Sequence, residues 1–599
     1  MSSTTLSAIL AATGGSFLLE DRMPAEVFTP EDLNEEQRQI AATAAQFVRE
    51  EVLPAAEEIE AKKPGVLPGL LRKAAELGLT SVDIPEEYGG MGLDKVSSTL
   101  ITDHISALAS FSTAFGAHIG IATLPLVWYG TEDQKRRYLP KLATAEWIGA
   151  YGLSEASSGS DAMNIRARAT LSADGSTYTL NGEKMWITNA AIAGLYTVFA
   201  KIDGERFSAF LIERDTPGLT VGAEEHKLGI RGSSTCPLVL TDCKVPAANL
   251  LGEPGKGHHI AFNVLNVGRF KLGVACVGGA RHGIAEMVRY AKDRTAFGKP
   301  IAEFGLIQRK IATSAARLFA AESMAYRTAG MMDAAMSELS PEKAHEPREI
   351  QRRIEEYAVE CSILKIYGSE MLSFVADELV AVMGGYGYVE HYPAERFYRD
   401  ARINRIFEGT NEINRLIVTG WLMKRAMSGK LPLLGAIKKV MDEVMQPPSL
   451  DGAGDTDEPL AHEAAMLAAT RKIAMFAAGV ASQRFMTGLE EQQEVMADLA
   501  DMIAQVYALE SGLLRARKLA AGGRGQARVA AEMTGLLAEE AMAQCDQAAK
   551  RVLAACGEGD TLRTQLVILR RLARMAPADS VALSRAVARR CVESQKYPM

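Results

Sequence analysis

One carboxylate in the last third of the chain has a sequence environment suited to proton transfer. Glu408 stands between Phe407 and Gly409 in the run Arg405-Ile-Phe-Glu-Gly-Thr-Asn-Glu412. A carboxylate flanked by an apolar ring and a glycine can be shielded from water and still be approached closely, which raises its pKa toward neutral pH. Such a group can act as a general base. For this short segment alone, the alternative is an ordinary surface glutamate before a turn.

Four further stretches precede Glu408 and are rich in glycine, serine and aromatic residues. In chain order they are Tyr151-Gly-Leu-Ser-Glu-Ala-Ser-Ser-Gly-Ser-Asp161, Met185-Trp-Ile-Thr188, Asp293-Arg-Thr-Ala-Phe-Gly-Lys299 and Met383-Gly-Gly-Tyr-Gly387. The last of them is not a dinucleotide-binding fingerprint, because its glycines neither follow a predicted strand nor open a βαβ unit. A nicotinamide enzyme is therefore disfavoured.

Composition and charge restrict the class of protein. With 599 residues, 48% of them hydrophobic, the chain exceeds what one core usually holds, so three or four domains are expected. A formal charge of -8 and the lack of a long basic run argue against nucleic acid as the main partner. The seven scattered cysteines and nine histidines show no metal-type spacing, which predicts no metal site and a reducing cytoplasm. The apolar run near the start lacks a basic segment before it and breaks at Gly14-Gly15, so neither a signal peptide nor a transmembrane helix is expected there. Elsewhere in the chain no uncharged span of about twenty residues is expected.

Helical periodicity dominates the first part of the chain. Residues 1–28 are expected to form an N-terminal tail. Thr29-Pro-Glu-Asp32 is typical of a helix start, with Thr29 as the N-cap and Pro30 in the first turn. Apolar residues then recur at three-to-four spacing, which predicts an all-helical N-terminal domain over residues 29–148.

The pattern changes between residues 149 and 252, where a β-domain is predicted. Tyr178–Ile187 alternates around Asn181-Gly182, a dipeptide typical of tight hairpins. Phe207–Ile212 and Pro237–Leu240 are predicted to be further strands. A small β-domain should therefore lie between helical ones.

Helical signals return after the predicted strands. Residues 253–445 contain long periodic segments and are predicted to form a helical bundle that carries Glu408. The charged stretch 342–356 within it is expected to be a solvated helix face or loop. The Pro/Gly/acidic composition of residues 446–458 indicates a linker. Residues 459–599, rich in Ala, Leu, Met, Glu and Arg, are predicted to form a second helical bundle.

Five motifs in this order, each in its expected structural context, resemble the acyl-CoA dehydrogenase family over residues of about 30 to 425. Within the family the chain is most similar to the very-long-chain branch. The resemblance implies a mostly α fold with a central β-domain: a helical N-terminal domain, a small β-barrel-like domain and a helical bundle, here with an extra C-terminal helical bundle. The very-long-chain branch carries such an extension and forms dimers.

The activity implied is FAD-dependent α,β-dehydrogenation of an acyl-CoA to a trans-2-enoyl-CoA in fatty acid β-oxidation. A base takes the α proton while hydrogen bonds polarise the thioester carbonyl, and the β hydrogen leaves as hydride to the flavin. The resemblance assigns the base to Glu408, and Gly409 lets the thioester approach. Some relatives carry the base just before the arginine of the pair Gly268-Arg269, where this chain has Gly268.

Residues in several segments match family positions that bind FAD. Trp186 and Thr188 match a Trp-x-Thr motif whose hydroxyl bonds to the flavin, although an isolated tryptophan is more often a core aromatic. Arg294 matches an arginine that contacts the pyrophosphate from the neighbouring subunit, and its alternative is an ordinary solvated arginine. The full cofactor set is Tyr151, Leu153, Ser154, Gly159, Ser160, Trp186, Ile187, Thr188, Arg294, Phe297, Gln308, Gly384, Gly385, Thr410 and Glu412. Two nearby positions, Asn164 and Ala381, depart from the family pattern.

The substrate positions implied by the same resemblance are Ser160, Asn266, Arg269, Phe407 and Gly409. For Arg269 a structural ion pair is the alternative. Ser112 and Gly116 stand where medium-chain relatives have larger polar residues at the floor of the acyl tunnel. Each additional buried methylene adds about 0.8 kcal/mol, so an open floor favours a long acyl chain.

The implied partners are the acyl-CoA substrate, electron-transferring flavoprotein and a second copy of the chain in a homodimer. The expected location is the cytoplasm, with peripheral contact to the inner face of the membrane as an option. Three alternatives remain open at this stage. They are an acyl-CoA oxidase that reduces oxygen, a non-catalytic scaffold that retains the fold, and a helical binding protein without a flavin.

Overall fold

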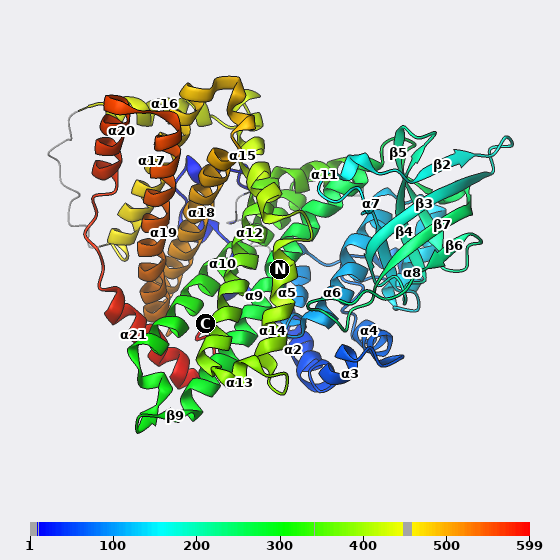
Figure 1. Ribbon diagram of the computed structural model, residues 1–599, viewed down its shortest axis with the longest axis horizontal. Helices are drawn as coiled ribbons and strands as arrows, with labels where there is room; N and C mark the ends of the chain where they lie inside the picture. Colours follow the sequence, from blue (N-terminus) through cyan, green and yellow to red (C-terminus); the bar gives the residue numbers. More distant parts are fainter. Residues whose placement is uncertain (1–8, 10, 341, 345, 447–457) are drawn as a thin grey trace.

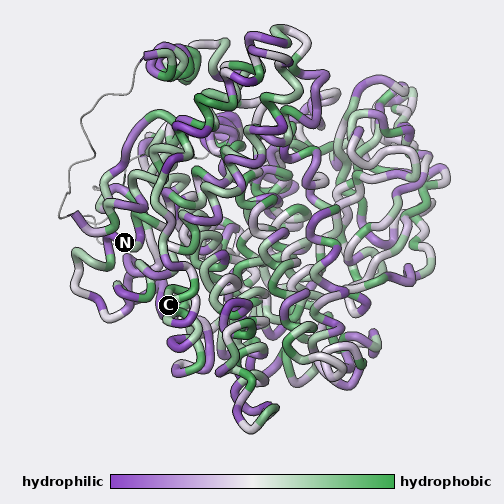
Figure 2. Tube along the Cα trace, turned by 60° about the vertical axis from the view of Figure 1, so that its left-hand side comes forward, coloured by the Kyte–Doolittle hydropathy of each residue, from purple (hydrophilic) through white to green (hydrophobic). Residues whose placement is uncertain are grey.

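The computed structural model describes residues 9, 11–340, 342–344, 346–446 and 458–599. The predicted linker at 446–458 lies almost entirely outside the described residues. Figure 1 shows the β-domain at one end of the molecule, the C-terminal helices at the other end and a helical bundle between them. Figure 2 shows hydrophobic and hydrophilic segments alternating along the helices, the pattern of helices with one buried face.

The first helical domain starts later than the sequence predicted. Thr29 caps only a short 3-10 turn, Pro30–Asp32. The first long helix begins at Glu35, where the Asn34 side chain accepts a hydrogen bond of 2.8 Å from the Gln37 amide. The helices of this domain are α2 Glu35–Phe47, α3 Ala56–Glu60, α4 Val66–Glu76, α5 Lys95–His104, α6 Ala109–Gly116, which continues as a wider turn to Ala122, α7 Leu124–Tyr129 and α8 Glu132–Ala143.

The β-domain is an eight-stranded sheet in the order β6-β7-β3-β2-β4-β5-β8, with β1 paired to β4 in parallel. The strands are β1 Gly149–Gly152, β2 Arg168–Leu171, β3 Thr177–Thr188, β4 Leu195–Ile202, β5 Arg206–Glu213, β6 Leu219–Val221, β7 Thr235–Pro246 and β8 Leu250–Leu251.

The hairpin predicted at Asn181-Gly182 is wrong, because both residues lie inside the continuous strand β3. The pairing of β3 with β7 shifts register between Leu180 and Gly182, which is a β-bulge. A Cβ on Gly182 would lie 2.8 Å from the Cα of Ala167. Glycine is therefore required here by the close approach of a neighbouring backbone and not by a tight turn.

The central bundle is built on three long helices, α9 Gly257–Asp293, α10 Gly305–Ser337 and α12 Ala358–Met383. Its shorter elements are a two-stranded hairpin, β9 Thr295–Ala296 and β10 Lys299–Pro300, and the helices α11 Pro347–Glu356, α13 Gly385–Tyr388, α14 Pro393–Ala401, α15 Asn411–Met427 and α16 Leu433–Val444. The architecture matches the predicted mostly α fold with a central β-domain.

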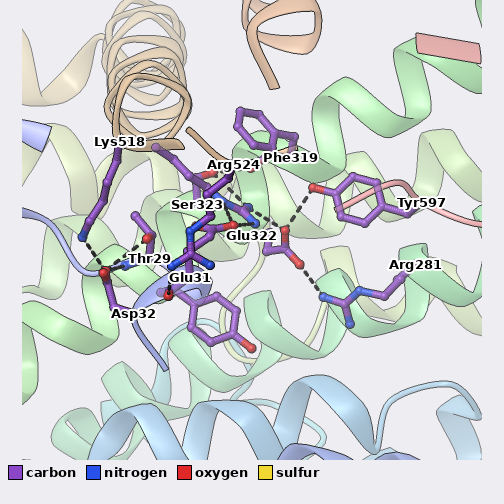
Figure 3. Close-up of polar contacts among 12 residues, drawn as sticks. Thr29, Glu31, Asp32, Arg281, Phe319, Glu322, Ser323, Lys518, Arg524 and Tyr597 are labelled. Atoms are coloured by element: carbon purple, nitrogen blue, oxygen red, sulfur yellow. Dashed lines mark hydrogen bonds and ion pairs between the residues drawn. The ribbon is translucent and has the colours of Figure 1, made fainter. Parts of the chain in front are cut away.

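The C-terminal helices share one hydrophobic core with the central bundle. They are α17 Ala461–Phe485, α18 Gln493–Ala521, α19 Ala527–Cys556, α20 Gly559–Leu572 and α21 Ser580–Ser594. Buried ion pairs also join them to the N-terminal segment (Figure 3). Arg515 on α18 lies 2.7 Å from Glu31 and 2.6 Å from Glu322 on α10, and the Tyr597 hydroxyl donates to Glu322. The extension is therefore packed into the bundle.

Within the described residues, three helical stretches are long and apolar enough to cross a membrane by length and composition alone. They are Ala109–Tyr129, Gly257–Asp293 and Ala461–Glu491, and their most apolar windows are 72%, 78% and 61% buried within the fold. The sequence interpretation expected no such stretch. Burial in the core of a large protein accounts for their composition.

Candidate active site

Glu408 lies in a short loop between α14 and α15 and adopts a backbone conformation that the surrounding structure must hold. Its φ is 59°, and that of Gly409 is 80°, so two consecutive residues are left-handed. A non-glycine residue in this region is strained. The loop is fixed by its carbonyls: Gly409 O accepts from Lys365 Nζ at 2.7 Å and from Asn414 Nδ2 at 2.8 Å, and Glu408 O accepts from Arg269 Nε at 3.4 Å.

The side chain of Glu408 has the electrostatics of a base that works near neutral pH. Its Oε2 is buried and has no hydrogen-bond partner among the described residues. Burial raises the pKa of the Glu408 carboxyl to about 7, against the opposing effect of Arg269 and Lys365. This is the direction that its sequence neighbours predict. A Cβ at position 268 would lie 2.4 Å from Oε2, so Gly268 leaves the space that the carboxylate fills.

The Glu408 carboxylate opens onto a cavity of about 180 Å³ between α6, α9, α12 and α14. Phe407, Thr188 and Gly268 line it together with Glu408, and Ser112 and Gly116 line it along α6. A Cβ on Gly116 would meet no other atom within 4 Å, so this glycine faces open space. The structure thus brings the predicted base, the β3 threonine and the predicted tunnel residues to one cavity.

One face of α9 runs along the whole cavity. Its lining residues recur every three or four positions, which places them in one stripe of the helix. Most of them are small or aliphatic, and the polar ones stand toward the two ends of the stripe: Gly268, Lys271, Leu272, Ala275, Cys276, Gly279, His282, Gly283 and Glu286.

The predicted cofactor residues of the β-domain lie beside this cavity but differ in exposure. Tyr151 on β1 is buried, and its hydroxyl has no partner among the described residues. Trp186 is 58% exposed with a φ of 59°, so it is not the core aromatic of the alternative interpretation. Ile187 points into the domain core, so its side chain is not accessible to a ligand. The Leu153 carbonyl accepts from buried Lys184.

The remaining residues of this segment are accessible. Gly159 and Ser160 lie in an exposed loop after β1, where a Cβ on Gly159 would meet no atom within 4 Å. Ser154 is half-buried, and its carbonyl accepts from the Met185 amide at 2.9 Å.

A second group of predicted cofactor residues lies away from the Glu408 cavity. Arg294 and Phe297 belong to the β9–β10 hairpin region, and Figure 1 shows β9 on the far side of the central bundle from the β-domain. The Arg294 guanidinium lies 6.0 Å from the ring of Tyr386, next to Gly385. Phe297 is 96% exposed, and Gln308 is half-buried in the first turn of α10. A Cβ on Gly384 or Gly385 would meet no atom within 4 Å.

The last predicted residues have local partners. Arg269 Nη1 donates to Asn266 Oδ1 at 2.8 Å, and Arg269 Nε donates to the Glu408 carbonyl. Arg269 therefore makes these two hydrogen bonds in place of the structural ion pair that was the alternative for it. Thr410 caps α15 by accepting from the Ile413 amide. Glu412 is exposed on the first turn of that helix.

Sequence reasoning missed Lys365, Asn411 and Asn414, which hold the loop of Glu408. Lys365 Nζ bonds both the Gly409 carbonyl and Asn411 Oδ1 at 2.7 Å. The signal in the sequence was a single lysine between Leu364 and Ile366 in an otherwise apolar stretch, since a lysine is rarely buried without a partner. Within the described part of the chain, no group of His, Cys, Asp or Glu side chains is placed to hold a metal ion.

Family models cover most of the chain. The N-terminal, middle and C-terminal domain models of acyl-CoA dehydrogenase match residues 34–146, 150–243 and 255–423. A further acyl-CoA dehydrogenase C-terminal domain model matches residues 469–571, within the extension.

Individual proteins agree with these matches. A probable acyl-CoA dehydrogenase of Bacillus subtilis is 46% identical over 586 residues, 98% of each chain. The human very long-chain specific acyl-CoA dehydrogenase is 38% identical over 404 residues, 65% of this chain and 58% of the human one. The crystal structure of an acyl-CoA dehydrogenase complexed with FAD from Bacillus anthracis superimposes with a TM-score of 0.95 at 46% identity, over 98% of this chain and 100% of that one. The chain therefore belongs to the acyl-CoA dehydrogenase family of oxidoreductases.

Proposed function

We propose that this protein binds FAD and oxidises long-chain acyl-CoA thioesters to trans-2-enoyl-CoA. The observation that carries the proposal is the Glu408 carboxylate, whose Oε2 is buried without a hydrogen-bond partner among the described residues, at the head of a long, mostly apolar cavity. A base with a pKa of about 7 and a channel for an acyl chain are two of the features that this reaction requires of the protein.

The residues of the β-domain fit a flavin ring. The buried hydroxyl of Tyr151 lacks a partner among the described residues, and Trp186 exposes an aromatic face. Thr188 lies on the same cavity as Glu408. An unpaired buried polar group is costly, and a polar ligand at this place would satisfy it. When bound there, FAD supplies the hydride acceptor.

The protein's own groups would perform the proton transfer. The Glu408 carboxylate would accept the α proton of the thioester, and the Glu408 backbone amide would donate a hydrogen bond to the thioester carbonyl oxygen. Gly409 has no side chain to obstruct the thioester. Phe407 and the wall at Gly268 keep water from the carboxylate, which maintains its basicity at neutral pH.

The length of the cavity supports a long-chain substrate. Gly268 and Gly283 both line it and are separated by fifteen residues, which corresponds to about 22 Å along α9. A zigzag chain with C–C bonds of roughly 1.5 Å advances about 1.3 Å per carbon, so this length accommodates roughly 17 carbons. Burial of each methylene adds about 0.8 kcal/mol of affinity.

We further propose a homodimer, because one group of cofactor residues belongs to the β-domain and the other to the region of β9 and α13, which Figure 1 shows apart from the β-domain. Tyr151, Trp186 and Thr188 would hold the flavin ring, while Arg294 and Gly384 of a second copy would reach its diphosphate and adenine end. Electron-transferring flavoprotein is the proposed acceptor. The cytoplasm is the proposed location, which is consistent with seven buried free cysteines. Peripheral contact with the membrane remains part of this proposal.

Anaerobic titration tests the proposed function. The purified protein should show a flavin spectrum that bleaches on addition of acyl-CoA, with efficiency that rises from C4 toward C16. Reoxidation by electron-transferring flavoprotein but not by oxygen would distinguish the dehydrogenase from an oxidase. A protein that binds flavin but is not bleached by any chain length would be a scaffold, and the proposal would fail.

A further inference from the structure

Lys365 is a fully buried lysine of α12 whose ammonium group points at the loop of Glu408. Its side chain is 0% exposed. Its Nζ donates to the Gly409 carbonyl and to Asn411 Oδ1, both at 2.7 Å. Burying an ammonium ion is costly unless it is hydrogen-bonded and paired with negative charge, so a retained buried lysine requires a local reason.

The first reason is the shape of the loop. Glu408 is held at a φ of 59°, a conformation that a residue with a side chain adopts only under constraint. The Gly409 carbonyl, one peptide further on, is fixed from two sides by Lys365 and Asn414. Lys365 also bonds Asn411, whose amide is anchored in turn to Ser369 Oγ at 3.0 Å. These bonds tie the turn that aims the Glu408 carboxylate to the rigid helix α12.

The second reason is charge. The cations that act on the Glu408 carboxylate are Arg269 from α9 and Lys365 from α12. Arg269 is engaged with Asn266 and the Glu408 carbonyl, and Tyr151 faces the carboxylate from β1.

Lys365 itself has few charged neighbours. The titratable groups that act on it are Arg269 from α9, Glu408 from the loop, Glu412 from α15 and the thiol of Cys276 from α9, which is neutral because burial raises its pKa to about 12. Burial lowers the pKa of Lys365 to about 8, so the side chain is still mainly cationic at pH 7. It therefore places a positive charge near the base where solvent cannot screen it.

We propose that Lys365 is the positioning residue of the catalytic base: it ties down the Gly409 carbonyl, which holds Glu408 in its left-handed turn, and its positive charge favours the ionised form of the Glu408 carboxylate. This inference rests on the proposed function, in which Glu408 removes the α proton. It assigns Lys365 no contact with substrate or cofactor.

The test measures proton abstraction without electron transfer. A 3-thiaacyl-CoA has sulfur at the β position and no hydrogen there, so it can exchange its α protons but cannot be oxidised to an enoyl-CoA. Holoenzyme is incubated with this probe in D2O, and deuterium at the α carbon is followed by mass spectrometry between pH 5.5 and 9. The variants are Lys365→Met, which keeps the volume and removes charge and donors, and Lys365→Arg, which keeps both.

The wild type should exchange with a midpoint near pH 7, the value of the Glu408 pKa. In Lys365→Met the midpoint should move up by roughly one pH unit, because a nearby cation favours the ionised carboxylate. The plateau rate should also fall at least about tenfold, since the loop is no longer held in place. Lys365→Arg should return the midpoint to the wild-type value. Content of FAD and the apparent KM for the probe should change little.

Lys95→Met is the matched control. Lys95 is another largely buried lysine, paired with Asp83 at 2.6 Å, and it does not line the cavity. Its replacement should lower the melting temperature without moving the exchange midpoint. If Lys365→Met behaves in the same way, Lys365 is only structural and the inference is wrong.

The other outcomes are also decisive. If Lys365→Met does not fold, Lys365→Gln is used in its place and should show the same shift of the exchange midpoint. If neither variant folds, Lys365 is required for folding itself and the inference is wrong. The proposed function is judged separately by the wild type and Glu408→Gln. If the wild type does not exchange, or Glu408→Gln exchanges normally, the assignment of the base fails irrespective of Lys365.

Discussion

Replacing Gly116 with phenylalanine should shorten the acyl chain that the enzyme accepts. A Cβ at Gly120, one turn further along the same segment, would lie 3.9 Å from Lys271 Cδ, and Lys271 is three residues along α9 from Gly268. The helical turn from Gly116 to Gly120 and the three residues from Lys271 to Gly268 add up to about 10 Å, which we take as the distance of Gly116 from the carboxylate end of the cavity. A phenyl ring at this level leaves room for roughly eight carbons.

The magnitude follows from the methylenes that lose their place. At about 0.8 kcal/mol each, eight excluded methylenes of a C16 chain amount to about 6 kcal/mol, which is an upper limit because the chain and helix can adjust. We expect kcat/KM for C16-CoA to fall at least about 100-fold, while that for C8-CoA changes by less than about threefold. Both values of kcat/KM are obtained from initial rates of reduction of the flavin, or of an artificial electron acceptor, with acyl-CoA substrates from C4 to C18.

Gly69→Phe is a suitable control for the chain-length experiment. Gly69 lies in α4, and a Cβ there also meets no atom within 4 Å, but it does not line the cavity. Its chain-length profile should match the wild type. Identical profiles for Gly116→Phe and wild type, or a wild type that prefers short chains, would refute the reasoning about the tunnel.

Three further changes have defined outcomes. Glu408→Gln should retain FAD and bind substrate, yet its flavin should be reduced at less than about 1% of the wild-type rate. In the wild type the rate of flavin reduction should rise with pH through about 7, the pKa of Glu408. Retained flavin reduction in the variant would contradict the assignment of Glu408 as the base. Arg294→Ala should lose FAD on extensive dialysis, measured by the flavin absorbance per chain, and unchanged flavin content would speak against its contact with the diphosphate. Burial raises the pKa of Glu360 from 4.5 to about 7, so its stabilising effect is full below pH 4.5 and is lost as pH rises through 7. Between pH 5 and 8 the free energy of unfolding of Glu360→Gln should therefore fall by on the order of 3 kcal/mol less than that of the wild type. Denaturant titrations at several pH values measure both, and the same pH dependence in the two proteins would exclude this role of Glu360.

Most of the fold was predictable because its signals are local. The long helices α9, α10 and α12 show their periodicity in the sequence, and the strand-rich middle is set apart by its alternation. Two local predictions failed for a common reason. Asn181-Gly182 is typical of a hairpin, but its glycine is needed because Ala167 approaches from another part of the β-domain. Thr29 carries the pattern of an N-cap, but the helix it caps ends after three residues. In both cases the deciding contacts or the length of the element are not encoded in the short motif.

The sequence by itself determined which residues are the candidates for the chemistry, because Glu408 and its neighbours Phe407 and Gly409 are adjacent in the chain and form a recognisable motif. Only the tertiary structure decided how that motif is held and charged. Lys365 lies 44 residues before Gly409 and meets it only when α12 packs against the loop. The same holds for the acyl cavity, whose walls come from α6, α9 and α14. The cost of burying a charge and the volume of a cavity depend on groups brought together from distant segments, and no single stretch of sequence contains them.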